Sequence, residues 1–479
     1  MSEHTTKRSS PNITLAVLLL GGAAYAVLSS AVIPALSTMQ HDLHTTESGI
    51  AWLLTGYLLA ASVGTSIIGR LGDMYGKERL LVWTLGALAA GTLLSAVSHS
   101  LGLVVAGRVI QGAGGGIYPL AYGIMRDEFP REKVAGSIGI MSAILGVGGG
   151  AGIVLSGPII EHLGWHWLFW FPLMLIVLAA VCTWRFVPES PVRVEGRINW
   201  LAALLMTVGM TISLLAISQT TEWGWGSART LGLLAIGIVI CIFWVITEVR
   251  SREPLIDMTM MRIRGVWTTN LAAFLLGGGM YTAFLIYPEF AQLAKPVGYG
   301  ASEVTAGLYL LPMALTMAVI GTTAGRIAAR VGSKVALVAG SASTMVAFAL
   351  LAITHAHSYD MLISSLLAGI GVGLAFSALG NLIVEAVAPE QTGVATGMNT
   401  VTRTLGGALG GQISATFIAA HVLHGTPQTT GFSQSFVMCT AFLLVALLAS
   451  MIVPGRRRGG GIAEQRGAEP SPLLAEEPA

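Results

Sequence analysis

Of the 479 residues in this chain, 54% are apolar (Ala, Val, Ile, Leu, Met, Phe, Trp, Tyr or Cys) and only 10% are charged. Soluble proteins have about 25% charged residues, and a surface with far fewer would expose large apolar patches, so the composition excludes a soluble multidomain protein. The net charge is only +2 and no basic stripe could follow a phosphate backbone, which excludes a nucleic acid as partner.

Fourteen long apolar runs, separated by polar turns, follow one another along the chain. They cover residues 13–36, 49–68, 80–97, 101–125, 134–160, 167–187, 198–219, 230–249, 266–288, 303–324, 335–353, 361–384, 392–420 and 434–453. A helix of about 20 apolar residues crosses a bilayer, and continuous runs predict helices rather than barrel strands. The first run is too long for a signal-peptide core. The sequence therefore predicts an all-α polytopic membrane protein with 14 transmembrane helices.

The basic residues are distributed unevenly between the two sides of such a bundle. If the N-terminus is cytoplasmic, 22 of the 26 Lys and Arg residues fall in cytoplasmic segments. Lys295 and Arg229 fall outside, and Arg108 and Arg403 fall within apolar runs. Both termini are therefore expected in the cytoplasm. The ratio of 21 Arg to 5 Lys, with abundant Ala and Gly, is typical of a high-GC genome and predicts the plasma (inner) membrane of a bacterium.

Histidine shows the opposite distribution, since nine of the ten residues map to outer loops. Two interpretations stay open, a pH-sensing role and plain loop polarity, because imidazole titrates near neutral pH. The three cysteines, Cys182, Cys241 and Cys439, all lie in apolar runs and predict neither a disulfide framework nor a metal cluster.

Two segments recur at nearly the same spacing. Residues 69–76 have an echo at residues 325–332, 256 residues later, and the glycines of residues 112–116 have one at residues 369–373, 257 residues later. Two parallel six-helix halves, with two further helices between them, explain both spacings. The predicted organisation is a disordered N-terminus (1–12), a six-helix bundle (13–188), a linker with two helices (189–265), a second six-helix bundle (266–454) and a disordered tail (455–479).

A turn of unusual composition follows the second run. Residues 69–79 read Gly-Arg-Leu-Gly-Asp-Met-Tyr-Gly-Lys-Glu-Arg, whose glycines allow a tight reversal and close approach of another helix. Asp73 can accept hydrogen bonds from a helix N-terminus, and the basic side chains are expected to meet the cytoplasmic headgroups. This pattern resembles the hallmark turn of the major facilitator superfamily. The resemblance implies a transporter whose conformational turn consists of Gly69, Arg70, Gly72, Asp73, Gly76, Lys77 and Arg79.

The fourth run contains a charged residue, Arg108, with Gln111 one helical turn later. A charge inside a span costs several kcal/mol and marks a functional candidate. The surrounding sequence resembles the arginine motif that drug:proton antiporters of the superfamily carry in this helix, which implies a role in proton transfer. The alternative is a structural arginine whose guanidinium is satisfied by helix carbonyl groups.

The layout from about Ile13 to Val453 resembles the fourteen-spanner drug:proton antiporter family. Supporting stretches are residues 165–170, 222–226, 252–257 and 389–397. Two features depart from that family. The glycine-rich fifth run has Ile153 where the antiporter motif has a proline, and the first run has Tyr25 where the family commonly has an aspartate. Both departures weaken the expectation of proton antiport.

Few acidic residues lie near the apolar runs. Glu289, between Pro288 and Phe290, is the first candidate for carrying a proton, and a solvated glutamate is the alternative. Arg403 is a candidate for proton coupling or substrate binding, or it pairs with nearby amides. Candidates for lining a substrate cavity, each of which could instead serve only packing, are Tyr25, Ser29, Gln111, Tyr118, Tyr122, Met141, Tyr281, Tyr287, Asn381 and Asn399.

No phosphate-binding loop, zinc-protease motif or nucleophile elbow with triad partners is found, so neither an enzyme nor direct use of ATP is expected. The leading hypothesis is export of small amphiphilic molecules (drugs or antibiotics) by rocker-switch alternating access, in exchange for protons. No cofactor is expected, with the proton gradient as energy source. One alternative is a dedicated exporter or facilitator of one endogenous metabolite without proton antiport. Another, less favoured because the tail is short, is a non-transporting membrane sensor.

The expected partners are the lipid bilayer and a small amphiphilic substrate, and the chain is expected to work as a monomer. Because Arg108 and Arg403 lie in apolar runs that contain almost no acids, a dicationic substrate is disfavoured. Neutral, zwitterionic and anionic amphiphiles all remain compatible with the sequence.

Overall fold

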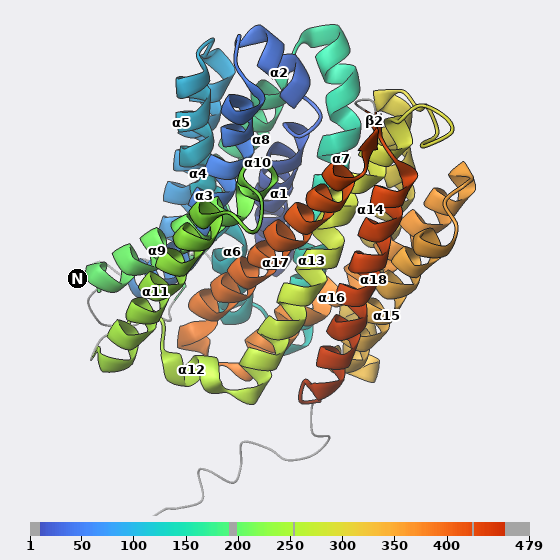
Figure 1. Ribbon diagram of the computed structural model, residues 1–479. Helices are drawn as coiled ribbons and strands as arrows, with labels where there is room; N and C mark the ends of the chain where they lie inside the picture. Colours follow the sequence, from blue (N-terminus) through green and yellow to red (C-terminus); the bar gives the residue numbers. More distant parts are fainter. Residues whose placement is uncertain (1–9, 191–198, 252–253, 424–425, 456–479) are drawn as a thin grey trace, which may run out of the picture.

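The computed structural model describes residues 10–190, 199–251, 254–423 and 426–455, and helices make up nearly all of them (Figure 1). Two antiparallel strands of two residues each, β1 (Val422–Leu423) and β2 (Thr426–Pro427), lie between the last two helices. Most of the N-terminal segment and tail that the sequence predicts to be disordered lie outside the described residues. Residues 10–12 are helical or cap a helix, because Ser10 caps α1 and Pro11 begins it.

The elements of the first half and of the central segment follow in chain order. The first half contains α1 (Pro11–Ala31), α2 (Leu36–Asp42), α3 (Glu47–Tyr75), α4 (Lys77–Val97), α5 (Leu101–Gln111), the 3₁₀-helix η1 (Gly112–Gly116), α6 (Ile117–Glu128), α7 (Arg131–Leu163) and α8 (Trp167–Phe186). The central segment contains α9 (Trp200–Ser218), α10 (Thr220–Trp223), α11 (Ala228–Arg250) and α12 (Met258–Arg262).

The second half contains α13 (Arg264–Gln292), α14 (Glu303–Val331), α15 (Ser333–Ile353), α16 (Ser358–Ala386), the 3₁₀-helix η2 (Pro389–Gln391), α17 (Thr392–Ala420) and α18 (Thr429–Ile452). In Figure 1 the first half is blue to teal, the second is yellow to red, and the green helices α9 and α11 lie at one side. The sequence repeat has a structural counterpart, because Gly76 and Gly332, 256 residues apart, both adopt positive φ (108° and 92°) between two helices.

Twelve of the described helices are long and apolar enough to cross a membrane. Each corresponds to one of the predicted runs. The run predicted at 101–125 is divided into α5, η1 and α6, because the glycines of η1 wind as a 3₁₀-helix and leave two shorter α-helices. The run at 392–420 forms the single helix α17, which is rich in Gly and Thr and carries Arg403.

The buried apolar side chains form three clusters. The first lies mainly among α1 and α3–α8 and includes Leu28 and Phe169, and the second lies mainly among α13–α18 and includes Phe348 and Phe436. The third joins α9, α11 and α12 to α16 and α17, with Trp244 among its members. The central helices therefore bury part of their apolar surface on the second half, while α9 also contacts α3 of the first half.

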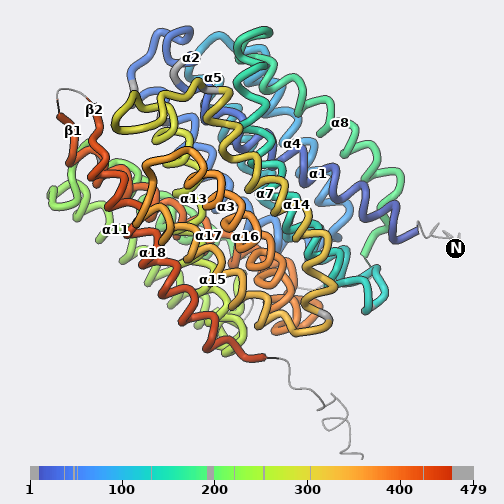
Figure 2. The backbone as a smooth tube through the Cα atoms, turned by 90° about the vertical axis from the view of Figure 1, so that its right-hand side faces the viewer, coloured from blue at the N-terminus to red at the C-terminus, as the bar shows by residue number. Residues whose placement is uncertain are grey.

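The two halves meet through α7, which contacts α14 and α16, and through α17, which contacts α3 and α6. Helices α7 and α14 lie side by side through the middle of the molecule, as Figure 2 shows, and helix α3 contacts α17. Helix α7, formed by the glycine-rich fifth run, packs closely on both α1 and α14. A Cβ added at Gly150 of α7 would lie 2.9 Å from the Cβ of Ala314 of α14. Small residues thus bring the halves into close contact.

Candidate functional site

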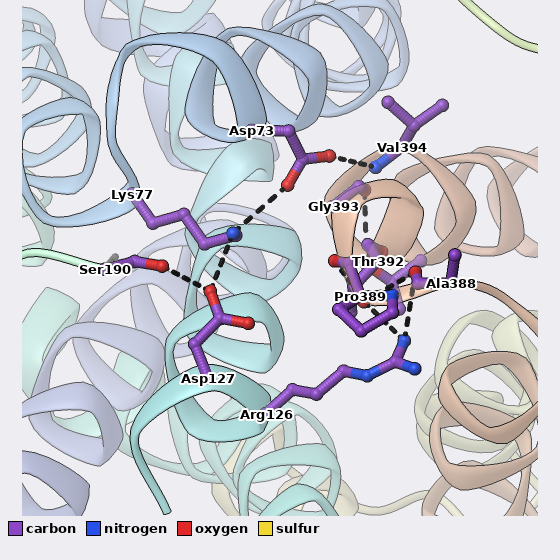
Figure 3. A network of polar contacts seen from close by, with 11 residues as sticks. Asp73, Lys77, Arg126, Asp127, Ser190, Ala388, Pro389, Thr392, Gly393 and Val394 are labelled. Atoms are coloured by element: carbon purple, nitrogen blue, oxygen red, sulfur yellow. Dashed lines mark hydrogen bonds and ion pairs between the residues drawn. The ribbon is translucent and has the colours of Figure 1, made fainter. Parts of the chain in front are cut away.

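The turn between α3 and α4 contacts the other half of the molecule through Asp73. The backbone N–H of Val394, in the first turn of α17, donates to Oδ2 of Asp73 over 3.3 Å (Figure 3). This is the hydrogen bond from a helix N-terminus that the sequence allows for Asp73, and the positive end of α17 favours the carboxylate there. We call the end of the bundle formed by the α3–α4 turn, the end of α6 and the α16–α17 turn the Asp73 end.

Lys77 lies in the interior of the Asp73 end. Its Nζ is 2.8 Å from Oδ2 of Asp127 and 3.5 Å from Oδ1 of Asp73, and the residue is 0% exposed (Figure 3). Asp127 also accepts a hydrogen bond from the hydroxyl of Ser190. The prediction that Lys77 meets the membrane headgroups is therefore wrong, because two buried carboxylates draw its ammonium inward. Arg79 is exposed and lies 3.4 Å from Glu189.

Arg126, at the end of α6, reaches across to the second half. Its guanidinium donates to the carbonyl oxygens of Val387 (2.8 Å) and Ala388 (3.3 Å) and to the hydroxyl of Thr392 (2.6 Å). Figure 3 shows Arg126 beside Ala388 and Thr392. Val387 caps the C-terminus of α16, whose free carbonyl groups attract a cation. Sequence reasoning placed Arg126 among the cytoplasmic charges but gave it no role.

The backbones of α3 and α17 touch beside Asp73. A Cβ added at Gly69 would lie 2.6 Å from the carbonyl oxygen of Gly393, and one added at Gly393 would lie 2.7 Å from that of Gly69. Only glycine fits both positions without a shift of the backbone. Together with Asp73 and Arg126, this contact closes the Asp73 end between the halves.

The central segment also reaches the Asp73 end. Asp257 caps α12 and accepts a hydrogen bond over 3.1 Å from the amide of Gln391, in the α16–α17 turn. Partial burial raises the pKa of this carboxyl, but hydrogen bonds from Thr259, Met260 and Gln391 outweigh it and hold the pKa below its ordinary value. The carboxylate of Glu248 in turn accepts from the backbone N–H of Leu255 over 2.8 Å.

Arg108 is fully buried and largely partnered. It donates to the carbonyl oxygen of Leu53 (3.2 Å) and to the amide oxygen of Gln111 (2.9 Å), and its guanidinium stacks 4.1 Å from the ring centroid of Tyr57. The amide nitrogen of Gln111 donates to Ser95 over 3.2 Å. The structure thus brings Arg108 and Gln111 together, as the sequence suggested. The backbone carbonyl group that accepts from Arg108 belongs to Leu53 of another helix, α3.

The aromatic candidates from the first half lie close together. The rings of Tyr57, Tyr25, Tyr118 and Tyr122 follow one another in this order, with centroid separations of 6.3, 6.1 and 6.2 Å. Tyr57, the one that sequence reasoning missed, comes from the middle of α3 and carries no motif. Tyr122 shares a 2.8 Å hydrogen bond with Ser142.

The other cavity candidates are more scattered. Tyr287 is buried in the second half, where it shares a hydrogen bond with Ser364. The remaining contacts are Ser29 to the backbone carbonyl of Ala26, Asn381 to the backbone carbonyl of Ala135, Asn399 to the side-chain amide oxygen of Asn270, Met141 beside Gly22, and Tyr281 beside Gly407. Only part of the predicted set therefore gathers in one place.

Glu289 is exposed and lies three residues before the end of α13. The other acids also lie near helix ends: every Asp and Glu in the described helices lies within three residues of the end of its helix. Among the described residues, no group of three or more His, Cys, Asp and Glu side chains could hold a metal ion. Acidic side chains are thus absent from the central parts of the described helices.

Comparisons with known proteins show which family has a similar sequence and architecture. The model of the Major Facilitator Superfamily matches residues 18–411 and 269–475. Multidrug resistance protein 3 of Bacillus subtilis (strain 168) is 27% identical over 87% of this chain and 81% of its own. Cephamycin export protein CmcT of Amycolatopsis lactamdurans is 29% identical over 95% of both chains.

A solved structure shows the same fold. The major facilitator proton:xylose symporter XylE superposes with a TM-score of 0.66 at 15% identity, over 93% of this chain and 96% of that one. The family model covers nearly the whole chain, and the structure has the paired helical halves and the glycine-rich α3–α4 turn. The chain belongs to the Major Facilitator Superfamily and is a membrane transporter.

Proposed function

We propose that this protein exports small amphiphilic molecules by alternating access. The observation that carries the proposal is the construction of the Asp73 end, where the halves are joined by single polar contacts and one glycine contact. The hydrogen bond of Asp73 to Val394 and those of Arg126 to the end of α16 are broken by a modest separation of the halves. Relatives named as multidrug resistance and antibiotic export proteins support the direction and class of transport.

The Asp73 end faces the cytoplasm in this proposal. The distribution of basic residues supports that orientation, because the turns that carry Arg70, Lys77 and Arg126 fall on the side where 22 of 26 basic residues gather. The described conformation is then closed toward the cytoplasm. We further propose that α5–η1–α6 and α17 cross the membrane with the twelve apolar helices, which gives 14 spans with α9 and α11 as the inserted pair and both termini in the cytoplasm of a bacterial inner membrane.

Proton exchange is the proposed energy source, and an imposed pH gradient tests it. In everted vesicles, a gradient with an acidic interior is expected to accelerate uptake of an amphiphilic dye compared with vesicles lacking a gradient. Vesicles treated with a protonophore are the control. Uptake that ignores the gradient would exclude proton antiport but would leave transport itself in place.

Glu289 is the proposed proton carrier, and its replacement by Gln is the corresponding test. E289Q is expected to abolish the acceleration by the gradient while downhill dye flux persists, since Gln cannot exchange a proton. Glu161, an exposed glutamate near the end of α7, provides a matched control in E161Q. Gradient-driven uptake by E289Q at the rate of E161Q would remove Glu289 from the mechanism.

A dedicated exporter of one metabolite is the second candidate function. Two observations favour it: the acids lie at helix ends rather than in the middle of the bundle, and a relative named for the export of a single antibiotic matches 95% of both chains. Competition between chemically different dyes for transport distinguishes the two candidates, because a dedicated exporter is not expected to accept several unrelated compounds.

A further inference from the structure

The middle of the bundle contains positive charge without matching negative charge. Arg403 lies eleven residues after the start of α17 and is 6% exposed, and Arg108 is 0% exposed. Neither forms an ion pair with a described residue, and the described helical acids all lie near helix ends. An unpaired charge away from water is expensive unless a counter-charge or several hydrogen bonds compensate it.

The two arginines differ in how many contacts the protein itself provides to the guanidinium group. Arg108 donates to Leu53 and Gln111 and stacks on Tyr57, although its buried Nη2 has no hydrogen-bond partner among the described residues. Arg403 stacks 4.2 Å from the ring centroid of Phe376, and its buried Nε has no hydrogen-bond partner among the described residues. Arg403 is therefore the less compensated of the two arginines.

The ring of Phe376 occupies a face of the Arg403 guanidinium and not its N–H edge. A ring beneath a guanidinium contacts its face, whereas the N–H groups project along its edge. Nε and the neighbouring Nη on that edge can donate two parallel hydrogen bonds to one carboxylate. The stacked ring fixes the plane of the group, so that part of the entropy cost of binding is already met.

Aromatic groups from both halves surround this position. Helix α6 of the first half, which carries Tyr118 and Tyr122, contacts α17. One helical turn after Arg403, Gly407 packs on the ring of Tyr281 of α13: a Cβ added there would lie 2.8 Å from that ring. A ligand placed between the halves would meet one cation and several rings.

We propose that Arg403 binds the anionic group of an aromatic, acidic substrate, with the rings of Tyr118, Tyr122 and Tyr281 contacting its apolar part. This inference rests on the proposed function and narrows its substrate class from amphiphiles in general to organic anions. The substrate enters when the halves separate, and its carboxylate or phenolate supplies the counter-charge that the helices lack. Arg108 is held by its own partners and sets the local potential.

Two dyes on the same xanthene scaffold test the proposal, anionic fluorescein and cationic rhodamine 123. Purified protein is assayed for dye binding by fluorescence anisotropy and, in proteoliposomes, for transport. Fluorescein is expected to bind more tightly than rhodamine 123. R403Q is expected to weaken fluorescein binding by about 10-fold or more, because the charged hydrogen bonds of the guanidinium are lost.

Two variants keep the test independent of folding. R403K retains the charge without the two-pronged donor geometry and is expected to bind fluorescein with intermediate affinity. R229Q removes an exposed arginine at the start of α11 and is expected to match the unchanged protein. Thermal unfolding of each variant checks that the comparison is between folded proteins.

The outcomes distinguish failure of the proposed anion site from failure of the proposed export. Two results would overturn the anion site while leaving amphiphile export in place. One is binding or transport of rhodamine 123 in preference to fluorescein, and the other is a fluorescein affinity that is unchanged in both R403Q and R403K. Binding of fluorescein that depends on Arg403, but without transport of either dye, supports the site and overturns the proposed export. Absence of binding by fluorescein overturns the site.

Discussion

Replacing Lys77 by Met is expected to lower the stability of the protein by about 3–5 kcal/mol, the usual cost of removing one member of a buried ion pair. Lys77 is 0% exposed, and its ammonium lies 2.8 Å from Asp127 and 3.5 Å from Asp73. Without it, two carboxylates remain close together in a buried environment. Thermal unfolding in detergent, followed by tryptophan fluorescence, measures the loss.

A second substitution tests the origin of that loss. K77M combined with D127N removes the cation and one of its two carboxylate partners, so the double variant is expected to be more stable than K77M alone. R79Q is the control, because Arg79 is exposed and its pair with Glu189 contributes at most about 1 kcal/mol. Equal shifts for K77M and R79Q would show that the buried ion pair contributes no more than a surface pair.

The helices could be predicted from the sequence because bilayer-spanning segments must be long, apolar and continuous. Twelve of the fourteen predicted runs are apolar helices of sufficient length, and the exceptions have visible causes in their composition. Five residues of η1, four of them glycine, leave the α-helical conformation, and α17 combines Gly and Thr with Arg403. The positive φ of Gly76 and Gly332 likewise follows from a repeat that is readable in the sequence.

The candidate site could be predicted only where its contacts are local. Arg108 and Gln111 are one helical turn apart, so their pairing follows from the sequence. The partner of Lys77, Asp127, lies 50 residues away, and the acceptors of Arg126 lie more than 260 residues away. Nothing in a basic turn indicates that one of its lysines is buried, because burial depends on which helix end packs against it.

The two contact surfaces between the halves differ in a way that suits a rocking motion. Helices α7 and α14 meet along small and apolar side chains, such as Gly150 and Ala314, which tolerate small rotations without losing directional bonds. The Asp73 end depends on directional hydrogen bonds from Val394 and Arg126, which are either formed or broken. A motion about α7 and α14 would therefore switch the Asp73 end between two states.

Replacing Gly69 by Ala is expected to hold the Asp73 end apart and to reduce transport by about 10-fold, since a shift of about 1.4 kcal/mol in the closing equilibrium changes it tenfold. The added Cβ would lie 2.6 Å from the carbonyl oxygen of Gly393 and 2.9 Å from its carbonyl carbon. Both atoms belong to the backbone of α17, so the helices themselves have to separate. The hydrogen bond between Val394 and Asp73 lies beside this contact and would lengthen with it.

Gly86 of α4 provides the matched control, because a Cβ added there meets no atom within 4 Å. The reporter is a cysteine in place of Ser66, which is 0% exposed and contacts Met398 of α17, in a protein whose three native cysteines are replaced by serine. N-ethylmaleimide is expected to label this cysteine faster in G69A than in G86A, because separated helices admit the reagent. Equal labelling and equal transport in the two variants would mean that the backbone contact between α3 and α17 does not govern closure.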